Sequence, residues 1–468
     1  MTSHVGTEAR PLRVAIIGAG PAGFYTAEAL LKQKNLVCSI DLINRLPTPF
    51  GLVRDGVAPD HQSIKAVTRV YEKIAANPNV RYYGNVTFGQ DIMLSDLIPH
   101  YDQIVYAVGA QSDRKMGIPG EDLAGSFPAT IFVGWYNGHP DYRDLEFDLS
   151  HERAIVVGNG NVAMDVTRIL VSSPDDLAKT DIADHALEHL RQSKVREVVV
   201  LGRRGPAQAA FTNPEIKEFG ELTGVDPIVD PAELDLDEVS IASLADNKMA
   251  ARNVETMRSY TERISTPGNR RICMRFLVSP VELIGANGRV AAVKIEKNAL
   301  YPSDDGSLRS RGTGVFEIIE AGLVLRSVGY QGVPLKDVPF DTRKYIVSNQ
   351  SGRVTDPESG KVVAGQYTVG WIKRGPSGVI GTNKADAVDT VKAMIEDLPQ
   401  LSGIDDANRD PALIQRLIAE RKPDHVSYQD WQLLDTYEIK TGEPQGRPRV
   451  KVTRVPDMLQ VIRQNKAM

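Results

Sequence analysis

The hydrophobic positions near the start of the chain predict a strand, a helix and a second strand. The run "RVAIIGAG" (13–20) is rich in β-branched residues and ends in glycine, whereas "PAGFYTAEALLK" (21–32) carries apolar residues at helical spacing. A second apolar run, "LVCSIDLIN", covers 36–44, and "YDQIVYAVGA" at 101–110 resembles a later strand of the same sheet. This order is typical of a parallel, Rossmann-like sheet.

The same pattern begins again in the middle of the chain. The run "RAIVVGNG" (153–160) precedes a helical segment from Asn161, and the apolar run "EVVVLGRR" (197–204) follows a polar insertion. Later, "AGLVLRSVGYQG" (321–332) ends in glycine as the strand before Gly109 does, which indicates that the chain returns to the first sheet there. A glycine-rich loop, a helix and a mixed helical extension complete the chain.

Composition narrows the class of protein. The 468 residues are enough for two or three domains, and 42% hydrophobic with 25% charged residues is typical of a soluble globular chain. A net charge of −5 argues against a general nucleic-acid binder. No apolar run is long enough to span a bilayer, and the N-terminal tail lacks a secretory signal, so we expect no membrane span and a cytoplasmic protein.

The chain contains two cysteines, Cys38 and Cys273, each in an apolar stretch. This number excludes a disulfide framework, a CxxC redox pair and an iron–sulfur cluster held by four thiolates of this chain. We therefore expect both cysteines to be small buried hydrophobic residues. We also expect no metal site.

The first glycine motif is GxGxxG at Gly18, Gly20 and Gly23, between a predicted strand and a predicted helix. The first glycine permits a tight turn, the second lets a pyrophosphate approach the backbone, and the third lets the helix pack closely on the strand. An acid that binds a ribose hydroxyl is expected at the end of the second strand, where this chain has Asn44. Asp41, the nearest carboxylate, lies inside that strand. The amide oxygen of Asn44 can still accept a ribose hydrogen bond.

The second motif is GxGxxA at Gly158, Gly160 and Ala163, in which alanine is an accepted third residue. The next strand ends in Arg203 and Arg204 rather than in an acid. Positive charge at this position suits the 2′-phosphate of NADP, although a solvated strand end is the simpler alternative. We therefore expect FAD at one motif and NADP(H) at the other.

Five segments carry a resemblance to a known family: "LPTPFGLVRDGVAPDH" (46–61), "GNGNVAMDV", "GRRGP", "FTNPE" and "GWIKRGPSGVIGTNK". Over nearly its whole length the chain resembles the adrenodoxin-reductase-like ferredoxin–NADP+ reductases. The resemblance implies an α/β fold with two Rossmann-like dinucleotide-binding domains, the NADP domain inserted in the FAD domain. We expect the FAD domain at 1–110 and 323–468, and the NADP domain at 111–322.

The resemblance also implies roles for individual residues. Those expected to hold FAD are Gly18, Gly20, Ala22, Gly23, Asn44 at the family's usual glutamate position, Leu52, Phe88, Trp371, Gly378, Val379 and Ile380. Those expected to hold NADP(H) are Arg114, Gly158, Asn159, Gly160, Asn161, Val162, Arg203, Arg204 and Glu215, with Gly378 meeting the nicotinamide.

Two further residues, His61 and Glu218, match catalytic-site residues that the family places near the contact of flavin and nicotinamide. Without the resemblance, His61 is equally well a capping or packing histidine, and Glu218 is a plain surface carboxylate. The helix that follows "GTNK" begins after a glycine-rich loop, so its positive end would stabilise reduced flavin.

The implied function is electron transfer between NADPH and a ferredoxin through FAD, because flavin can accept a hydride and release single electrons. The chain cannot hold its own four-thiolate cluster, so the acceptor must be a separate protein. Two alternatives remain: an NADPH diaphorase or quinone reductase with small acceptors, and a nucleotide-binding regulator without turnover. The missing CxxC disfavours a disulfide reductase.

Two neighbouring segments have opposite charge. The segment 221–246 contains eight acids and no Lys or Arg, whereas 248–275 contains seven Lys or Arg against two Glu. Solvated surfaces are the ordinary interpretation. Because ferredoxins are usually acidic, the alternative is that Arg252, Arg258 and Arg263 lie on the face that docks the ferredoxin.

Overall fold

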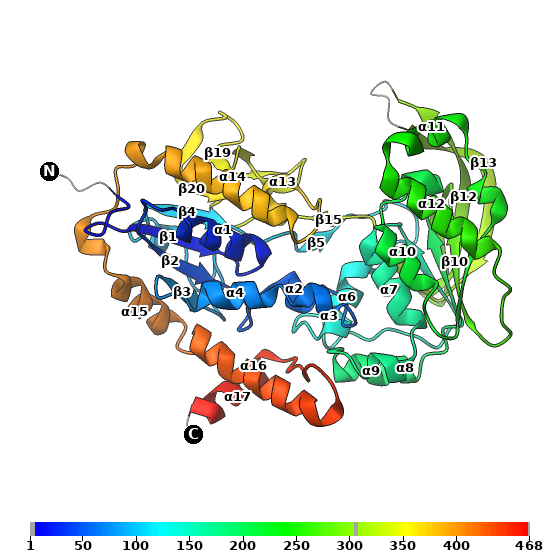
Figure 1. Ribbon diagram of the computed structural model, residues 1–468, viewed down its shortest axis with the longest axis horizontal. Helices are drawn as coiled ribbons and strands as arrows, with labels where there is room; N and C mark the ends of the chain where they lie inside the picture. Colours follow the sequence, from blue (N-terminus) through cyan, green and yellow to red (C-terminus); the bar gives the residue numbers. More distant parts are fainter. Residues whose placement is uncertain (1–4, 304–307, 467–468) are drawn as a thin grey trace.

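The computed structural model describes residues 5–303 and 308–466, which form two lobes, one built on a largely parallel sheet and the other on a fully parallel one (Figure 1). The first lobe contains both the blue N-terminal and the orange C-terminal parts of the chain, and the second contains the green middle part. This arrangement confirms the expected α/β fold class.

The first sheet has seven strands in the order β18-β19-β20-β4-β1-β2-β3. Strands β1 to β4 and β20 are parallel, and Val14 in β1 lies between Ile40 of β2 and Gln103 of β4. The strands are β1 (Leu12–Ile17), β2 (Cys38–Ile43), β3 (Val80–Tyr83), β4 (Gln103–Tyr106), β18 (Asn349–Gln350), β19 (Arg353–Thr355) and β20 (Val362–Thr368).

Helices cover the first sheet and the adjoining loops, and helix α1 packs along helix α14 (Figure 1). Consequently, segments that are more than 300 residues apart in sequence share one core. The helices of this lobe are α1 (Pro21–Leu31), α2 (Leu52–Asp55), α3 (Gln62–Lys65), α4 (Thr68–Ala75), α5 (Leu94–Leu97), α13 (Trp371–Arg374) and α14 (Thr382–Glu396). The expected helical extension consists of α15 (Pro411–Arg421), α16 (Tyr428–Gly442) and α17 (Val455–Lys466).

The second sheet has six parallel strands in the order β6-β14-β7-β8-β10-β9. They are β6 (Ser126–Pro128), β7 (Arg153–Val157), β8 (Glu197–Leu201), β9 (Val225–Val229), β10 (Arg270–Arg275) and β14 (Leu323–Arg326). The helices around it include α6 (Ala129–Asn137), α7 (Asn161–Val171), α8 (Pro174–Leu177), α9 (Asp184–Arg191), α10 (Asn213–Phe219), α11 (Glu238–Asp246) and α12 (Lys248–Thr261).

Strand β14 corrects one expectation. The chain was expected to return to the first sheet at 323, but Leu323–Arg326 pairs with β6 and β7 in the second. A glycine after a buried apolar run marks the end of a parallel strand in either sheet, so the pattern could not decide between them. The return to the first sheet follows β14.

Between the lobes, the chain crosses twice, and the crossings lie side by side. Strand β5 (Ser112–Asp113) pairs antiparallel with β15 (Tyr330–Gln331). A three-stranded antiparallel sheet of β11 (Val278–Ala286), β12 (Arg289–Pro302) and β13 (Leu308–Glu320) adds a layer to the second lobe. The sequence patterns did not predict this layer.

Both cysteines are free; Cys38 is buried as expected, but Cys273 is only half-buried, which corrects the expectation for it. Burial raises the pKa of Cys38 to about 11 and that of Cys273 to about 12. Among the described residues, no helix combines the length and apolar character that crossing a bilayer requires.

Candidate functional site: two glycine turns and an ion-pair cluster between the lobes

The first glycine turn, Gly18–Gly23, joins β1 to α1 at the carboxyl end of the first sheet. Gly18 has φ of +110°, and a Cβ on Gly23 would lie 2.1 Å from the carbonyl oxygen of Gly18. At Gly20, by contrast, the nearest atom to a Cβ would be 3.9 Å away, on Gly51. Helix α1 has no side-chain cap, so its first N–H groups are available to an anion.

The side chain of Asn44 binds the backbone of this turn instead of pointing away from it. Its Oδ1 accepts a hydrogen bond from the backbone N–H of Ala19 at 3.2 Å, and its Nδ2 donates to the carbonyls of Leu46 and Thr48 at 2.9 and 3.0 Å. The N–H of Phe50 donates to the carbonyl of Ala19 at 2.8 Å. Asn44 therefore ties the first glycine turn to the loop that follows β2, a role that the sequence pattern did not reveal.

The segment from Gly370 to Ile380 lies against the start of α1. A Cβ on Gly370 would come 2.6 Å from the Cβ of Ala22, which brings the two distant parts of the expected FAD site together. The Trp371 ring lies 5.0 Å from that of Tyr330 and its Nε1 donates to the carbonyl of Ser377 at 3.1 Å. Gly378 has φ of +79°, Val379 is exposed, and Ile380 packs on the core beside α14.

Leu52 and Phe88 occupy different surroundings. Leu52 is exposed at the start of α2, directly after Gly51, which approaches the first glycine turn. Phe88 is half-buried 5.9 Å from the ring of Tyr106. It packs on the cluster formed by Ile17 and its neighbours, on the sheet face opposite α1.

The second glycine turn, Gly158–Ala163, joins β7 to α7. Gly158 has φ of +117°, and a Cβ there would lie 2.2 Å from the carbonyl oxygen of Ser327, whereas a Cβ on Gly160 would meet no atom within 4 Å. Asn161 accepts a hydrogen bond from the N–H of Thr212 at 2.9 Å, and the carbonyl of Asn159 accepts one from Ala210 at 3.1 Å.

Arg203 and Arg204 follow β8 at the carboxyl end of the second sheet, as expected. Arg203 is exposed and Arg204 half-buried, and burial together with the charge of Arg203 lowers the pKa of Arg204. The two guanidinium groups repel each other, and a bound anion would reduce this repulsion. Arg114, also exposed, follows β5, and its N–H donates to the carbonyl of Gly329 at 2.9 Å.

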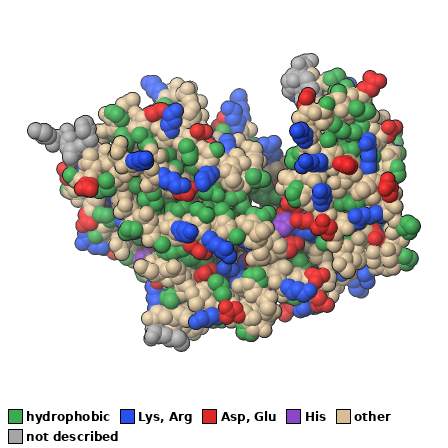
Figure 2. All heavy atoms as spheres, in the orientation of Figure 1, with side chains coloured by type: hydrophobic (Ala, Val, Ile, Leu, Met, Phe, Trp, Pro, Cys, Tyr) green, Lys and Arg blue, Asp and Glu red, His purple; other side chains and the backbone are tan. Residues whose placement is uncertain are grey.

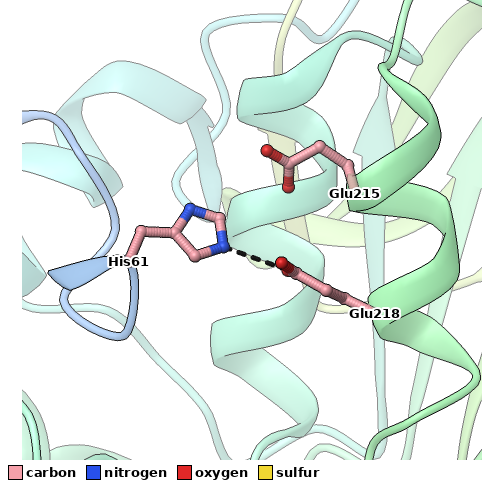
Figure 3. Close-up of side chains that lie close together, drawn as sticks. All are labelled: His61, Glu215 and Glu218. Carbon is pink, nitrogen blue, oxygen red and sulfur yellow. Dashed lines mark hydrogen bonds and ion pairs between the residues drawn. The ribbon is translucent and has the colours of Figure 1, made fainter. Parts of the chain in front are cut away.

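Three other predicted residues meet at the boundary of the lobes (Figure 3). His61, in the loop before α3, forms a 3.0 Å hydrogen bond through Nε2 with Glu218 of α10. Glu215, one turn earlier on α10, also points toward His61, and ligand atoms of the three residues lie within 4.8 Å of one another. The first lobe thus contributes the imidazole and the second the carboxylates.

Three charged residues that the sequence analysis missed complete this cluster: Asp60, Asp165 and Arg168. Arg168 is buried on α7 with its side chain 2% exposed, and it forms ion pairs with Asp60, Asp165, Glu215 and Glu218. The signal that could have revealed it is an arginine inside the apolar helical run "VTRILV", because a charge on a core-facing helix position requires buried partners.

The cluster shifts several pKa values. Burial and the charge of Asp165 raise the pKa of Glu215 to about 7. Burial lowers the pKa of His61, but the hydrogen bond to Glu218 and the charges of Asp165 and Asp60 outweigh it, so the net shift is upward. Burial also raises the pKa of Asp165. The site can therefore hold a proton between the lobes near neutral pH.

A metal ion is a poor fit to His61, Glu215 and Glu218. Arg168 Nη1 lies 3.3 Å from an oxygen of Glu215 and 3.0 Å from one of Glu218, so a cationic group already pairs with both carboxylates. A second cation would meet that charge directly. The cluster is better described as an ion-pair network.

Known proteins match this chain over almost its full length. Residues 12–204 match the family profile described as "Pyridine nucleotide-disulphide oxidoreductase". The "NADPH-ferredoxin reductase FprA" of Mycobacterium leprae (strain TN) is 46% identical over 96% of this chain and 98% of its own. The mitochondrial "NADPH:adrenodoxin oxidoreductase" of Salvelinus fontinalis is 40% identical over 98% of this chain and 92% of its own.

A solved structure agrees with these sequence matches. The structure described as "Mycobacterium tuberculosis FprA in complex with NADPH" superposes with a TM-score of 0.91 at 45% identity, over 97% of this chain and 100% of that one. Identity and coverage at this level establish the family and confirm the resemblance carried by the five sequence segments. The chain belongs to the family of NADPH–ferredoxin reductases that includes FprA and the NADPH:adrenodoxin oxidoreductases.

Proposed function

We propose that this chain is an FAD-containing NADPH–ferredoxin reductase, which takes two electrons from NADPH and delivers them one at a time to ferredoxin-type iron–sulfur proteins. The observation that carries the proposal is the pairing of two glycine turns, each at the carboxyl end of its own parallel sheet, in lobes joined by His61 and Glu218. Overall, one NADPH and two oxidised ferredoxins would give NADP+, one proton and two reduced ferredoxins.

The residues present fit both cofactors. Open space beside Gly20 and Gly160, at the uncapped starts of α1 and α7, suits two pyrophosphates. Bound FAD would supply the exchange between two-electron and one-electron chemistry. We propose that FAD is held by the first glycine turn with Ala22, Asn44, Leu52, Phe88, Trp371 and 378–380. NADP(H) would be held by Arg114, 158–162, Arg203, Arg204 and Glu215.

We further propose two domains that follow the two sheets. The flavin domain would comprise both ends of the chain and the NADP domain the middle, with the expected boundary at 323 moved to the crossing at β15. Pairing of β5 with β15 supports this division, since both chain crossings lie there.

His61 and Glu218 would bring the two lobes into register for hydride transfer. The imidazole Nε2 donates to the Glu218 carboxylate at 3.0 Å, which fixes the orientation of the ring. The His61 side chain is 12% exposed and that of Glu218 is 34% exposed, so solvent reaches the carboxylate more readily than the imidazole.

The partner surface is proposed on the second lobe beside α10. Arg252 and Arg263, exposed on and after α12, line a groove of about 460 Å³ together with Lys217 of α10. Figure 2 shows Lys and Arg side chains on both rims of the notch between the lobes. Arg258, the third arginine expected on this face, is also exposed but is not among the residues that line the groove.

Salt and charge reversal test this surface. Ferredoxin-dependent turnover should fall steeply as salt rises, because attraction between exposed charges is screened over about 8–10 Å at physiological salt. Turnover with a small neutral quinone should not fall. Reversing Arg252 and Arg263 to Glu should raise the KM for ferredoxin at low salt, with Arg258→Glu as the comparison. Unchanged ferredoxin kinetics in the double variant would place docking elsewhere.

The decisive experiment for the function is NADPH-dependent reduction of cytochrome c, with and without added ferredoxin. We expect a yellow protein that NADPH bleaches under anaerobic conditions and a rate that depends on ferredoxin. Equal rates without ferredoxin would favour the diaphorase or quinone reductase alternative. A colourless protein, or one that NADPH does not bleach, would favour the regulator.

We also propose a cytoplasmic location. Support comes from the two free cysteines, neither of which forms a disulfide, since unpaired thiols are typical of reducing compartments. Localisation of the tagged full-length protein in cell fractions tests this part of the proposal.

A further inference from the structure

Arg168 pairs with four carboxylates that come from three different segments of the chain. Its Nε and Nη2 pair with both oxygens of Asp60 at 2.7 and 3.0 Å, and Nη2 also donates to Asp165 at 2.8 Å. Its Nη1 lies 3.3 Å from Glu215 and 3.0 Å from Glu218. The five N–H bonds of one guanidinium thus face five carboxylate oxygens on four residues.

Two of these oxygens also flank the imidazole of His61. Oε2 of Glu218 lies 3.0 Å from His61 Nε2 and 3.0 Å from Arg168 Nη1. Oδ1 of Asp165 lies 3.7 Å from His61 Nδ1 and 2.8 Å from Arg168 Nη2. The guanidinium of Arg168 therefore pairs with both carboxylates that lie beside the imidazole ring.

Arg168 also spans the boundary of the lobes. It lies on α7, the helix that starts at the second glycine turn, whereas Asp60 precedes His61 in the first lobe. Any change in the angle or spacing of the lobes would break the bidentate Asp60 pair, since that geometry tolerates little displacement. The contact therefore fixes α7 relative to the loop that carries His61.

We propose that Arg168 is a positioning residue for hydride transfer, which holds the two glycine turns at their working separation through Asp60 and aims Glu218 at His61. This inference rests on the proposed function. Lysine cannot replace arginine in this role, because an ammonium offers three donors from one point rather than a planar fork.

The charge of Arg168 also acts on four titratable groups of the cluster. It lowers the pKa of Asp60, His61, Asp165 and Glu215 relative to what burial alone would give. The hydroxyl of Tyr136, buried without a hydrogen-bond partner, also senses this charge. Removal of the charge should therefore move the pH dependence of any step that uses these groups to higher pH.

The test is anaerobic rapid mixing of the flavin-loaded protein with NADPH, comparing Arg168→Lys and Arg168→Met with wild type. We expect normal flavin content and a nearly unchanged KM for NADPH. Bleaching at saturating NADPH should slow about 100-fold, as small misplacements of reacting groups do. The lysine variant keeps the charge, so only the methionine variant should shift the pH profile upward. Delivery of electrons from photochemically reduced flavin to ferredoxin should be unaffected.

The matched control is Arg270→Gln. Arg270 donates to the carbonyls of Val171 and Ser172 at the far end of the same helix and touches none of the cluster. It should bleach at the wild-type rate. A wild-type rate in Arg168→Lys, or an unshifted profile in Arg168→Met, would overturn the proposal.

Asp60→Asn provides a second route if the arginine variants do not fold. The Asp60 side chain is 27% exposed in a loop, so its replacement removes the charged contact between the lobes without opening a cavity in the core. Bleaching should slow about tenfold, and a wild-type rate would again contradict the positioning role. If wild-type protein itself is not bleached by NADPH, the proposed function fails instead, which separates the two ideas.

Discussion

The middle glycine of the first turn faces another segment of its own lobe, whereas the middle glycine of the second faces open space. Around the first, Asn44 accepts a hydrogen bond from the N–H of Ala19, a Cβ on Gly20 would lie 3.9 Å from the Cα of Gly51, and Gly370 lies beside Ala22. At Gly160 in the second, no atom lies within 4 Å of where a side chain would begin. We therefore expect the two turns to retain their ligands for different times: the first would keep a cofactor bound, and the second would release a nucleotide after each turnover.

The largest expected effect comes from placing a side chain in each turn. Gly20 and Gly160 have φ of −90° and −95°, which valine can adopt, so a substitution acts mainly on the ligand. Gly20→Val should yield protein without flavin colour, whereas Gly160→Val should keep its flavin but fail to bleach with NADPH. The ratio of flavin to protein absorbance measures the flavin content, and the loss of flavin absorbance after addition of NADPH measures the bleaching. Full flavin in Gly20→Val would contradict the assignment of the first turn.

The next effect concerns which nucleotide the open turn selects. Replacing both Arg203 and Arg204 by Ala should weaken the use of NADPH about 10- to 100-fold, since hydrogen bonds to charged groups contribute about 1.5–3 kcal/mol. The use of NADH should barely change. The control is Arg271→Ala, because Arg271 of β10 pairs with Glu197 at the opposite end of β8 from Arg203 and Arg204. Equal losses of kcat/KM with both nucleotides would refute a 2′-phosphate site.

A smaller effect should follow from opening the enclosed turn. Asn44→Ala leaves the N–H of Ala19 and the carbonyl of Thr48 without partners, while the Leu46 carbonyl keeps the Asn85 N–H and the Tyr82 hydroxyl; the free energy of unfolding should fall by about 2–4 kcal/mol. Flavin should also be released faster on dilution. The counterpart Asn161→Ala removes one bond to Thr212 at the second turn and should leave flavin retention unchanged. Retention that is the same in both variants would show that Asn44 does not enclose the cofactor.

The smallest expected effect is a pH dependence of stability that is caused by Glu215 in the second lobe. The pKa of Glu215 is raised from 4.5 to about 7, so the folded state holds this proton more tightly than the unfolded state does. Its contribution to stability should fall as pH rises between these values and stay low above them. Glu215→Gln should therefore be more stable than wild type by about 1–3 kcal/mol at pH 8 and by nothing at pH 4. A constant difference in urea midpoint would disprove the shift.

Much of this architecture could be predicted from local patterns. Strands β1, β2, β4, β7 and β8 and both glycine turns lie where the apolar runs and glycine spacings indicated. The pattern failed at β14, because a buried apolar strand does not encode which sheet receives it. It also failed to predict the antiparallel layer β11 to β13, whose mixed burial gives no simple alternation.

The candidate site was predicted in its motifs but not in its connections. His61 and Glu218 entered through a resemblance, and their hydrogen bond spans 157 residues of sequence. Arg168 and Asp60 are 108 residues apart, and the local sequence around either residue does not indicate the other as its partner. Asn44 was expected to face a ribose, yet its amide is satisfied by three backbone groups. Contacts of this kind depend on tertiary packing that periodicity does not describe.

The paired crossings β5 and β15 make the second lobe one continuous insertion in the first. A segment that leaves and re-enters its host through two adjacent strands can be exchanged for a related one that keeps its contacts with the host, here the pairing of Asp181 with Lys65 and Lys451. Recombination at Ser112–Asp113 and Tyr330–Gln331 would therefore transplant nucleotide preference between related enzymes as one continuous cassette.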